Sequence, residues 1–314
     1  MSGEAPSPSP GFPALPDRIT IREVAPRDGL QPEEPRPAAW RAVLAASLVR
    51  TGVTAIEVAA FVSPKAVPSM ADPAAVVSKL RDALDPVDDV VTVFALVPNV
   101  RGAQMAAETR VDALTLTVSA SEAYSQRNVH MSVDESLAQV EAIRAVIGDE
   151  LPIDTVLSCA FGSPYEGDID PGAVAALGRR ALASGSTSLT YADTTGMATP
   201  RRVADLLEET GTDVGLHLHD TRGTALVNAY AAMQWQVRRF DTAVGGLGGS
   251  PFAAGAGGNL ATEDLVHLCD DVGVATGIDL DALLAVSAQV AEAVRHAVPS
   301  RVAAAGPRSR LHPG

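Results

Sequence analysis

The chain alternates eight times between a short run of β-branched residues and a longer Ala-rich stretch with helical character. The predicted strands span 19–26, 55–62, 90–97, 113–119, 153–161, 188–193, 214–220 and 240–245. The predicted helices span 38–51, 73–84, 100–109, 133–147, 171–184, 200–210, 223–237 and 262–272. This alternation indicates parallel strands joined by helical crossovers, and eight such units close into a TIM (β/α)8 barrel.

A doubly wound open sheet is the competing architecture. That fold usually carries a Gly-rich fingerprint after its first strand, whereas the first run here ends in Pro26-Arg27-Asp28-Gly29. An additional C-terminal helix is predicted over 280–297, after the eighth unit. We therefore expect one barrel domain over 18–300, with a disordered Pro- and Ser-rich segment over 1–17 and a flexible tail over 301–314.

Charge and composition limit the partners of this chain. It has 24 Lys+Arg and 38 Asp+Glu residues, a formal net charge of −14, which argues against nonspecific binding to nucleic acid or to an anionic membrane surface. Two cysteines in 314 residues do not form a disulfide framework. No apolar run reaches the roughly 18 residues of a membrane-spanning helix, and the N-terminal segment lacks the parts of a signal peptide. We expect a cytoplasmic protein.

The most informative chemical feature is His217-Leu218-His219 at the end of the seventh predicted strand. Residues two apart on a strand point to the same side, so two imidazoles converge from one rigid element. Such a pair suits a divalent metal when Asp28 adds a carboxylate and Asn259 a carbonyl oxygen, and Mg²⁺, Mn²⁺ and Zn²⁺ all fit these donors. The alternative is two core or surface histidines, but barrel enzymes place their chemistry where strands end.

Charged residues of the first two units belong to the same rim. A strand-end Arg27 beside a metal-binding Asp28 suits stabilisation of a developing enolate or carboxylate, the alternative being a surface ion pair of little value. Glu57 lies inside the apolar run 55–62, and a buried carboxylate needs a partner. We interpret Glu57 as the partner that orients Arg27 rather than as a reacting group.

Two features of the later strands have alternative interpretations. The segment 245–259 has seven glycines in fifteen residues, which indicates either a lid over a reactive intermediate or a flexible surface loop. Cys159, at the end of the fifth predicted strand, either lines the pocket or packs in the core.

Six segments in order along the chain carry a family resemblance. They are EVAPRDGLQPEE (23–34), AIEVAAFVSPKAVPSMAD (55–72), SCAFGSPYEGD (158–168), YADTTGMATP (191–200), HLHDTRGTALVNA (217–229) and GGLGGSPFAAGAGGNLATEDLV (245–266). Together they resemble the hydroxymethylglutaryl-CoA lyase family, whose members are metal-dependent TIM-barrel carbon–carbon lyases related to the isopropylmalate synthases. The resemblance covers 19–281.

The resemblance implies roles for individual residues. Arg27 would stabilise the enolate of the departing acetyl thioester, and Gln31 is expected to bind substrate. Lys65 lies near the pocket mouth by motif position and is expected to contact coenzyme A. Glu57 and Asp193 match active-site positions of the family. The ligands of Mg²⁺ or Mn²⁺ would be Asp28, His217, His219 and Asn259.

One position departs from the family pattern. The family carries a cysteine after GGLGG, whereas this chain has Ser250. The family thiol is thought to assist proton transfer at the product enolate, and serine is a much weaker acid than a thiol with a pKa of about 8.5. We keep Ser250 as a candidate catalytic residue and expect the usual rate or the usual substrate to be altered.

The expected reaction is retro-Claisen cleavage of a 3-hydroxy-3-methylglutaryl-CoA-like thioester to acetyl-CoA and a keto acid, which is acetoacetate for HMG-CoA itself. Candidate bases for the hydroxyl proton are Asp28, Asp193 and His217. The alternatives are cleavage of citramalyl-CoA or a longer 3-hydroxyglutaryl-CoA analogue, a catalytically weak barrel that binds metal and acyl-CoA, and condensation in the reverse direction. The family leads us to expect a homodimer or larger homo-oligomer.

Overall fold

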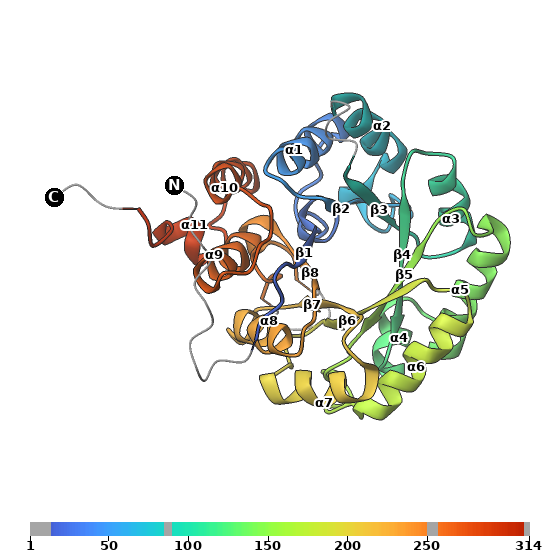
Figure 1. The fold of residues 1–314 in the computed structure, drawn as a ribbon. Helices are drawn as coiled ribbons and strands as arrows, with labels where there is room; N and C mark the ends of the chain where they lie inside the picture. The colour runs from blue at the N-terminus through green and yellow to red at the C-terminus, as the bar shows by residue number, and fades with distance from the viewer. Residues whose placement is uncertain (1–13, 85–89, 250–256, 311–314) are drawn as a thin grey trace.

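The structure is a computed structural model that describes residues 14–84, 90–249 and 257–310. Within these ranges eight parallel strands form a closed barrel (Figure 1), which confirms the TIM-barrel prediction. Strand β1 pairs with β8, with Thr20 opposite Arg239, so the sheet has no free edge. The strands are β1 (Thr20–Glu23), β2 (Ala55–Ala60), β3 (Thr92–Leu96), β4 (Ala113–Ser119), β5 (Ile153–Ser158), β6 (Ser188–Asp193), β7 (Gly215–Leu218) and β8 (Arg239–Thr242).

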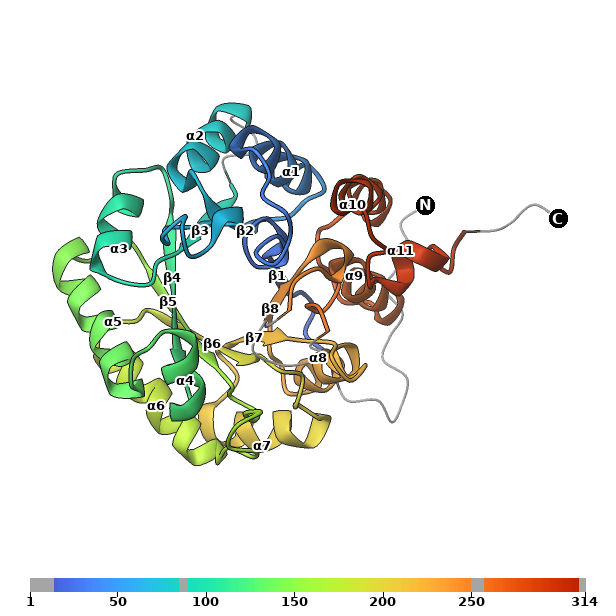
Figure 2. The same cartoon turned by 180° about the vertical axis from the view of Figure 1, so that it is seen from behind.

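Helices follow the strands and cover the outside of the barrel, as both views show (Figures 1 and 2). The predicted additional helix is α10 (Leu280–Val294), which packs against α1 (Ala38–Arg50) and α9 (Thr262–Val272). The crossover helices are α1 (Ala38–Arg50), α2 (Pro73–Ala83), α3 (Val100–Ala107), α5 (Val133–Ile147), α6 (Pro171–Ala183), α7 (Pro200–Thr210), α8 (Ala225–Gln234) and α9 (Thr262–Val272).

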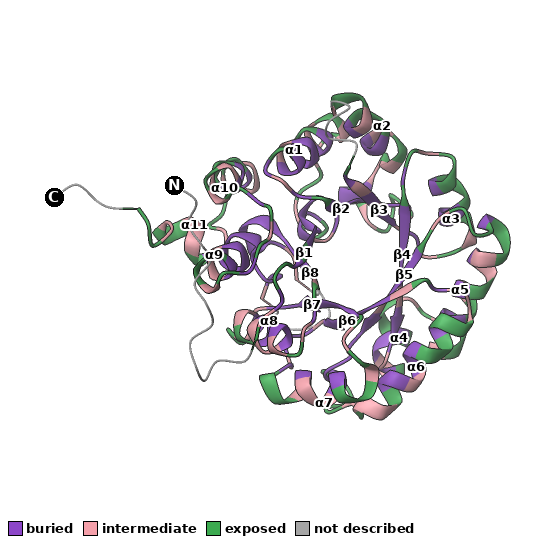
Figure 3. Cartoon of the chain, in the orientation of Figure 1, coloured by how far each residue is buried: buried purple, intermediate pink, exposed green. Residues whose placement is uncertain are grey.

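Burial follows the same layers. The strands are buried along almost their whole length, whereas the helices bury only the faces that turn toward the barrel (Figure 3). The buried apolar side chains are mainly Ala, Val and Leu, in keeping with an aromatic content of 4%. Polar side chains at the ends of strands that are buried in this way are held on a rigid support.

The first strand is shorter than predicted. It ends at Glu23, and Ala25–Gly29 form one π-helical turn, η1, in place of the predicted strand end. Pro26 has no N–H for a ladder hydrogen bond, and the N–H groups of Asp28 and Gly29 donate to the Val24 carbonyl at 2.7 and 3.2 Å. This turn brings residues 27 and 28 into the cavity at the carboxyl end of the barrel.

A short helix, α4 (Glu122–Asn128), follows β4 and was not predicted. Its first turn is capped by the Ser121 hydroxyl, which accepts a hydrogen bond from the Tyr124 N–H at 3.1 Å. The helix has only seven residues. A segment of this length is too short to show the hydrophobic periodicity from which helices are predicted.

Both boundaries of the predicted domain differ from the expectation. At the N-terminal side, the Asp17 carbonyl already accepts a hydrogen bond from the Ala275 N–H at 2.9 Å, while 1–13 lie outside the described residues. At the C-terminal side, Arg301–Ala305 form helix α11, so the flexible-tail prediction is wrong for these residues. The buried Asp264 carboxylate accepts the Ser300 hydroxyl at 2.8 Å, which anchors this helix to α9. Among the described residues, no helix has the length and apolar character needed to cross a membrane.

Candidate active site

A cavity of about 300 Å³ opens at the carboxyl ends of the strands. This is the rim at which barrel enzymes place their chemistry. All eight strand units contribute to its walls, from Arg27 in the first to Asp241 in the eighth. The candidate residues from the sequence that line this cavity are Arg27, Asp28, Gln31, His217 and His219. Ser158 and Thr194 line it as well.

Three metal-ligating side chains meet in this cavity. The Nε2 atom of His217 lies 3.0 Å from Nε2 of His219 and 3.9 Å from Oδ2 of Asp28. One ligand atom from each of the three residues lies within 4.8 Å of the others. Two ligands that each lie about 2.1 Å from an octahedral ion are roughly 3.0 Å apart. The spacing of the two imidazoles therefore fits chelation of one divalent cation.

Asn259 joins these three residues through its side-chain amide. Its Nδ2 group donates to Asp28 Oδ2 and to the Leu247 carbonyl, both at 2.8 Å. Its Oδ1 atom is buried and has no hydrogen-bond partner. A buried acceptor without a partner is costly unless an ion or water binds it. This oxygen, together with one carboxylate and two imidazoles, shows that the donor set fits a divalent cation.

Glycine at position 248 lets the loop after β8 approach these ligands. Its φ angle is +99°, and a Cβ atom there would lie 2.5 Å from the Asn259 amide nitrogen and 3.2 Å from the Asp28 carbonyl. Only glycine combines that backbone conformation with so close an approach. Part of the Gly-rich segment predicted as a lid, 250–256, lies outside the described residues, and so does Ser250.

The protonation states match the needs of a cation. Burial alone would raise the pKa of Asp28, but Arg27 and the two histidines hold it well below its usual range. Burial lowers the pKa of His219 to about 4. Burial also acts to lower the pKa of His217, but the hydrogen bond to Asp241 and the charge of Asp28 raise it overall. An ionised carboxylate and neutral imidazoles are the forms that bind metal, and His217 reaches its neutral form by releasing a proton.

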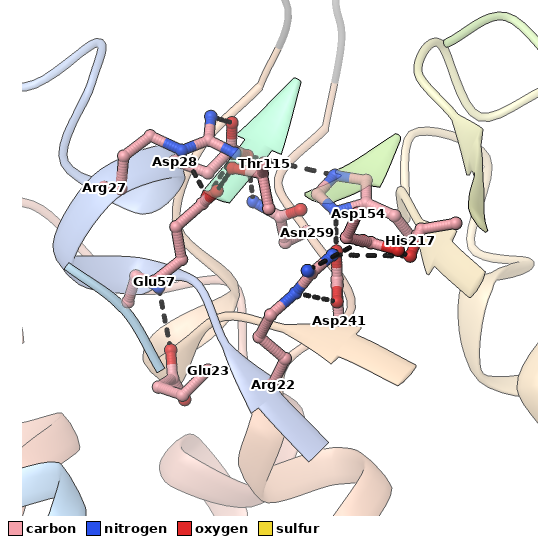
Figure 4. A network of polar contacts seen from close by, with 12 residues as sticks. Arg22, Glu23, Arg27, Asp28, Glu57, Thr115, Asp154, His217, Asp241 and Asn259 are labelled. Carbon is pink, nitrogen blue, oxygen red and sulfur yellow. Dashed lines mark hydrogen bonds and ion pairs between the residues drawn. The ribbon is translucent and has the colours of Figure 1, made fainter. Parts of the chain in front are cut away.

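Arg27 is held from two sides (Figure 4). Its Nη1 atom pairs with Asp28 Oδ1 at 2.5 Å, while Nε and Nη2 pair with Oε2 of Glu57. Glu57 is only 1% exposed, and its other oxygen accepts a hydrogen bond from the Thr115 hydroxyl. The predicted ion pair between Arg27 and Glu57 is therefore present, and it fixes the guanidinium beside a metal-ligating carboxylate.

Asp193 lies at the end of β6 but is not among the residues that line the cavity. Its Oδ1 atom accepts hydrogen bonds from the N–H groups of Met197 and Ala198 at 2.6 and 3.0 Å, which braces the loop after β6. Its Oδ2 atom is buried without a partner. Burial raises the pKa of Asp193 to about 6. A catalytic role for this residue stays a prediction.

The remaining sequence candidates take different positions. Gln31 lines the cavity, and Lys65 is exposed between Val62 and Val67, which both line it. Cys159 is buried in a left-handed conformation (φ 56°), and burial raises the pKa of its thiol to about 12. That thiol is a core residue and a poor proton donor near neutral pH.

Sequence reasoning missed two parts of the cavity. One is Asp241, an acidic residue within the buried strand β8 that contacts His217. An acidic residue inside a predicted barrel strand was the available signal, because such a residue needs a buried partner. The other is the wall formed by Tyr124, Asn128 and Val129 of the α4 region, which depends on a helix that was not predicted.

A closed barrel with two histidines, an aspartate and an asparagine at its carboxyl rim defines a metal-dependent enzyme of the TIM-barrel class. Comparison with known proteins places the chain more narrowly. The model of the HMGL-like family matches residues 18–290. The chain belongs to this family of metal-dependent carbon–carbon lyases, which confirms the resemblance carried by the six segments.

Individual relatives match over almost their full length. The chain is 40% identical over 304 residues to an (R)-citramalyl-CoA lyase from Chloroflexus aurantiacus, covering 93% of this chain and 96% of that protein. It is 37% identical over 298 residues to a 3-hydroxy-3-isohexenylglutaryl-CoA/hydroxymethylglutaryl-CoA lyase from Pseudomonas aeruginosa, covering 93% and 98%. The solved structure of an HMG-CoA lyase from Acinetobacter baumannii, in complex with coenzyme A and 3-methylmalate, matches with a TM-score of 0.88 at 38% identity, covering 95% of this chain and 98% of that one.

Proposed function

We propose that this chain cleaves a 3-hydroxy-3-methylglutaryl-CoA-like thioester to acetyl-CoA and a keto acid, with Mg²⁺ or Mn²⁺ as cofactor. The observation that carries the proposal is the meeting of Asp28, His217 and His219 in one cavity with a fixed arginine beside them. Family membership and the activities of the named relatives support the same reaction class.

Four residues would hold the cation: Asp28, His217, His219 and Asn259. A bound divalent cation would supply Lewis acidity, which would lower the pKa of the tertiary hydroxyl of the substrate. The protein side chains around it hold the substrate and shield the reacting carbon from bulk water. We propose that Gln31 contacts the acyl group and that Lys65 contacts the coenzyme A part at the cavity mouth.

Arg27 acts on the charge that develops during cleavage. Breaking the bond between C2 and C3 leaves the electron pair on the acetyl thioester, as an enolate. The guanidinium of Arg27 is fixed in the cavity by Glu57 and Asp28, so it can stabilise the enolate oxygen without reorganising. Asp28, Asp193 and His217 are the candidates to receive the hydroxyl proton, and Ser250 is the candidate that returns a proton to the enolate carbon.

Two related substrates compete with HMG-CoA. The matched relatives include a citramalyl-CoA lyase and a lyase for a longer isohexenyl analogue, and the chain has Ser250 in the glycine-rich loop. Cleavage of citramalyl-CoA would give pyruvate and acetyl-CoA. These two thioesters are therefore alternative substrates of the same site.

A coupled assay tests the proposal. Purified protein is incubated with each of the three thioesters and with Mg²⁺ or Mn²⁺, and acetyl-CoA and the keto product are measured. We expect cleavage of at least one thioester, lost in His219→Gln and retained in the exposed-site control Glu292→Gln. If none is cleaved with either metal, the proposal is wrong; if acyl-CoA binds tightly without turnover, the chain is a binding protein instead.

Ser250→Cys tests the account of the loop. We expect this variant to cleave HMG-CoA faster, because a thiol returns a proton more readily than an alcohol near neutral pH. An unchanged or lower rate would remove that account.

We also propose that the chain forms a homodimer, which sedimentation of the purified protein measures directly.

A further inference from the structure

A charged network lies beneath the metal ligands, inside the barrel. Arg22 of β1 donates from Nε to Oδ1 and from Nη2 to Oδ2 of Asp241, both at 2.8 Å. Its Nη1 atom donates to Oδ2 of Asp154 on β5, also at 2.8 Å. Arg22, Asp154 and Asp241 are 8%, 3% and 5% exposed. A two-pronged arginine–carboxylate pair at this depth fixes both groups in place.

Asp241 belongs to this network and also contacts the metal site. Its Oδ2 atom lies 3.2 Å from Nδ1 of His217. An ionised carboxylate only accepts hydrogen bonds, so Nδ1 carries the proton and Nε2 of the neutral ring keeps its lone pair. That Nε2 atom is the one that faces His219 and Asp28. The contact therefore selects the tautomer of His217 that can bind a cation. Figure 4 shows His217 and Asp241 within the network of polar contacts.

The position of the pair in the fold gives a second argument. Asp241 lines the catalytic cavity and also a cavity of about 330 Å³ at the amino ends of the strands, which Arg22 lines as well. The guanidinium of Arg22 lies 4.9 Å from the centre of the Phe94 ring. Arg22 and Asp241 thus form part of the floor between the two ends of the barrel, where apolar side chains usually pack. Buried ion pairs can often be replaced by apolar residues without loss of stability, so stability alone does not account for these charges.

We propose that Asp241 is a positioning residue for the metal ligand His217 and that Arg22 holds Asp241 in the orientation this requires. The inference rests on the proposed function only in that a divalent cation binds at His217. Carboxylates that orient metal-ligating histidines in this way typically contribute about 10- to 100-fold to metal affinity.

Asp241→Asn and Asp154→Asn form a matched pair for the test. Both carboxylates accept a hydrogen bond from Arg22 at 2.8 Å, and only Asp241 reaches His217. Mn²⁺ is titrated into the metal-free full chain and free Mn²⁺ is followed by electron paramagnetic resonance, while the melting temperature of each metal-free variant is recorded. We expect Asp241→Asn to weaken Mn²⁺ binding about 10- to 100-fold and Asp154→Asn to bind Mn²⁺ nearly as the unaltered chain does, although both melt at lower temperature.

A purely structural role predicts a different result, namely equal changes in the two variants. Equal Mn²⁺ affinities, or an unaltered chain that binds no Mn²⁺, would overturn the inference. If Asp241→Asn does not fold, ¹⁵N resonances of the unaltered metal-free protein decide the matter, with His217 assigned by comparison with His217→Asn. Protonation of Nδ1 supports the inference, and protonation of Nε2 alone overturns it. Lyase activity is scored separately: a chain that binds Mn²⁺ as expected but cleaves no thioester refutes the proposed function and leaves this inference standing.

Discussion

Replacing Glu57 by glutamine tests whether this residue supports Arg27 or reacts itself. The side chain is 1% exposed, and it accepts hydrogen bonds from Arg27 and from Thr115. Glutamine has the same shape and keeps one acceptor oxygen, so the substitution removes the charge and weakens one charge-assisted hydrogen bond. Such a bond contributes about 1.5–3 kcal/mol, which corresponds to a decrease of roughly 10- to 150-fold in kcat if the guanidinium must be fixed to stabilise the enolate.

The assay is steady-state acetyl-CoA release at saturating metal, measured across pH for Glu57→Gln, Arg27→Lys and the double variant. A supporting role predicts that kcat falls while the shape of the pH profile is unchanged. It also predicts that the two substitutions are strongly non-additive, because both disrupt the same pair. Additive losses, or the disappearance of a pH limb in Glu57→Gln alone, would show that Glu57 transfers a proton and would refute the reasoning.

Three further predictions concern protons and metal. If Asp193 is the base, its pKa of about 6 makes kcat/KM fall as the pH drops below about 6. Asp193→Asn should lower the rate about 100-fold and remove this acidic limb of the pH profile. An unchanged pH profile in the variant would exclude Asp193 as the base. Burial raises the pKa of Glu263 from 4.5 to about 7. Between these two pH values the unfolded chain releases the proton and the folded chain keeps it. The stabilisation from the protonated side chain is therefore complete below pH 4.5 and is lost as the pH rises to 7, which lowers the free energy of unfolding by about 3 kcal/mol. Urea unfolding at pH 5 and pH 7.5 should therefore show a smaller pH dependence in Glu263→Gln than in Glu292→Gln, which changes an exposed residue. Mn²⁺ at 100 times its dissociation constant should stabilise the protein by about 2.7 kcal/mol, and this increment should vanish with chelator or in His219→Gln; a stabilisation that survives His219→Gln would place the cation elsewhere.

The local pattern of the sequence was sufficient for the barrel and for part of the site. The alternation of apolar runs and Ala-rich stretches predicts eight β/α units, because the two periodicities are properties of neighbouring residues. The same logic places His217 and His219 on one side of a strand, and their Nε2 atoms lie 3.0 Å apart. Glu57 could be assigned to Arg27 because a buried carboxylate requires a cation.

Other features depend on how strands pair with one another in the closed sheet, and no local sequence pattern contains this information. The π-helical turn Ala25–Gly29, which carries Asp28 toward His217, follows directly after β1, the strand that closes the barrel on β8. The register between β7 and β8 places Asp241 opposite His217.

Sequence alone therefore determined the fold class and which residue types could bind a cation. The tertiary structure decided which of these side chains meet. It brought Asp28 to 3.9 Å from His217, and it turned Asp193 toward the backbone of its own loop. The physical reason is that periodicity specifies which face of an element a residue occupies, whereas the distance between residues on different strands depends on the register and closure of the whole sheet.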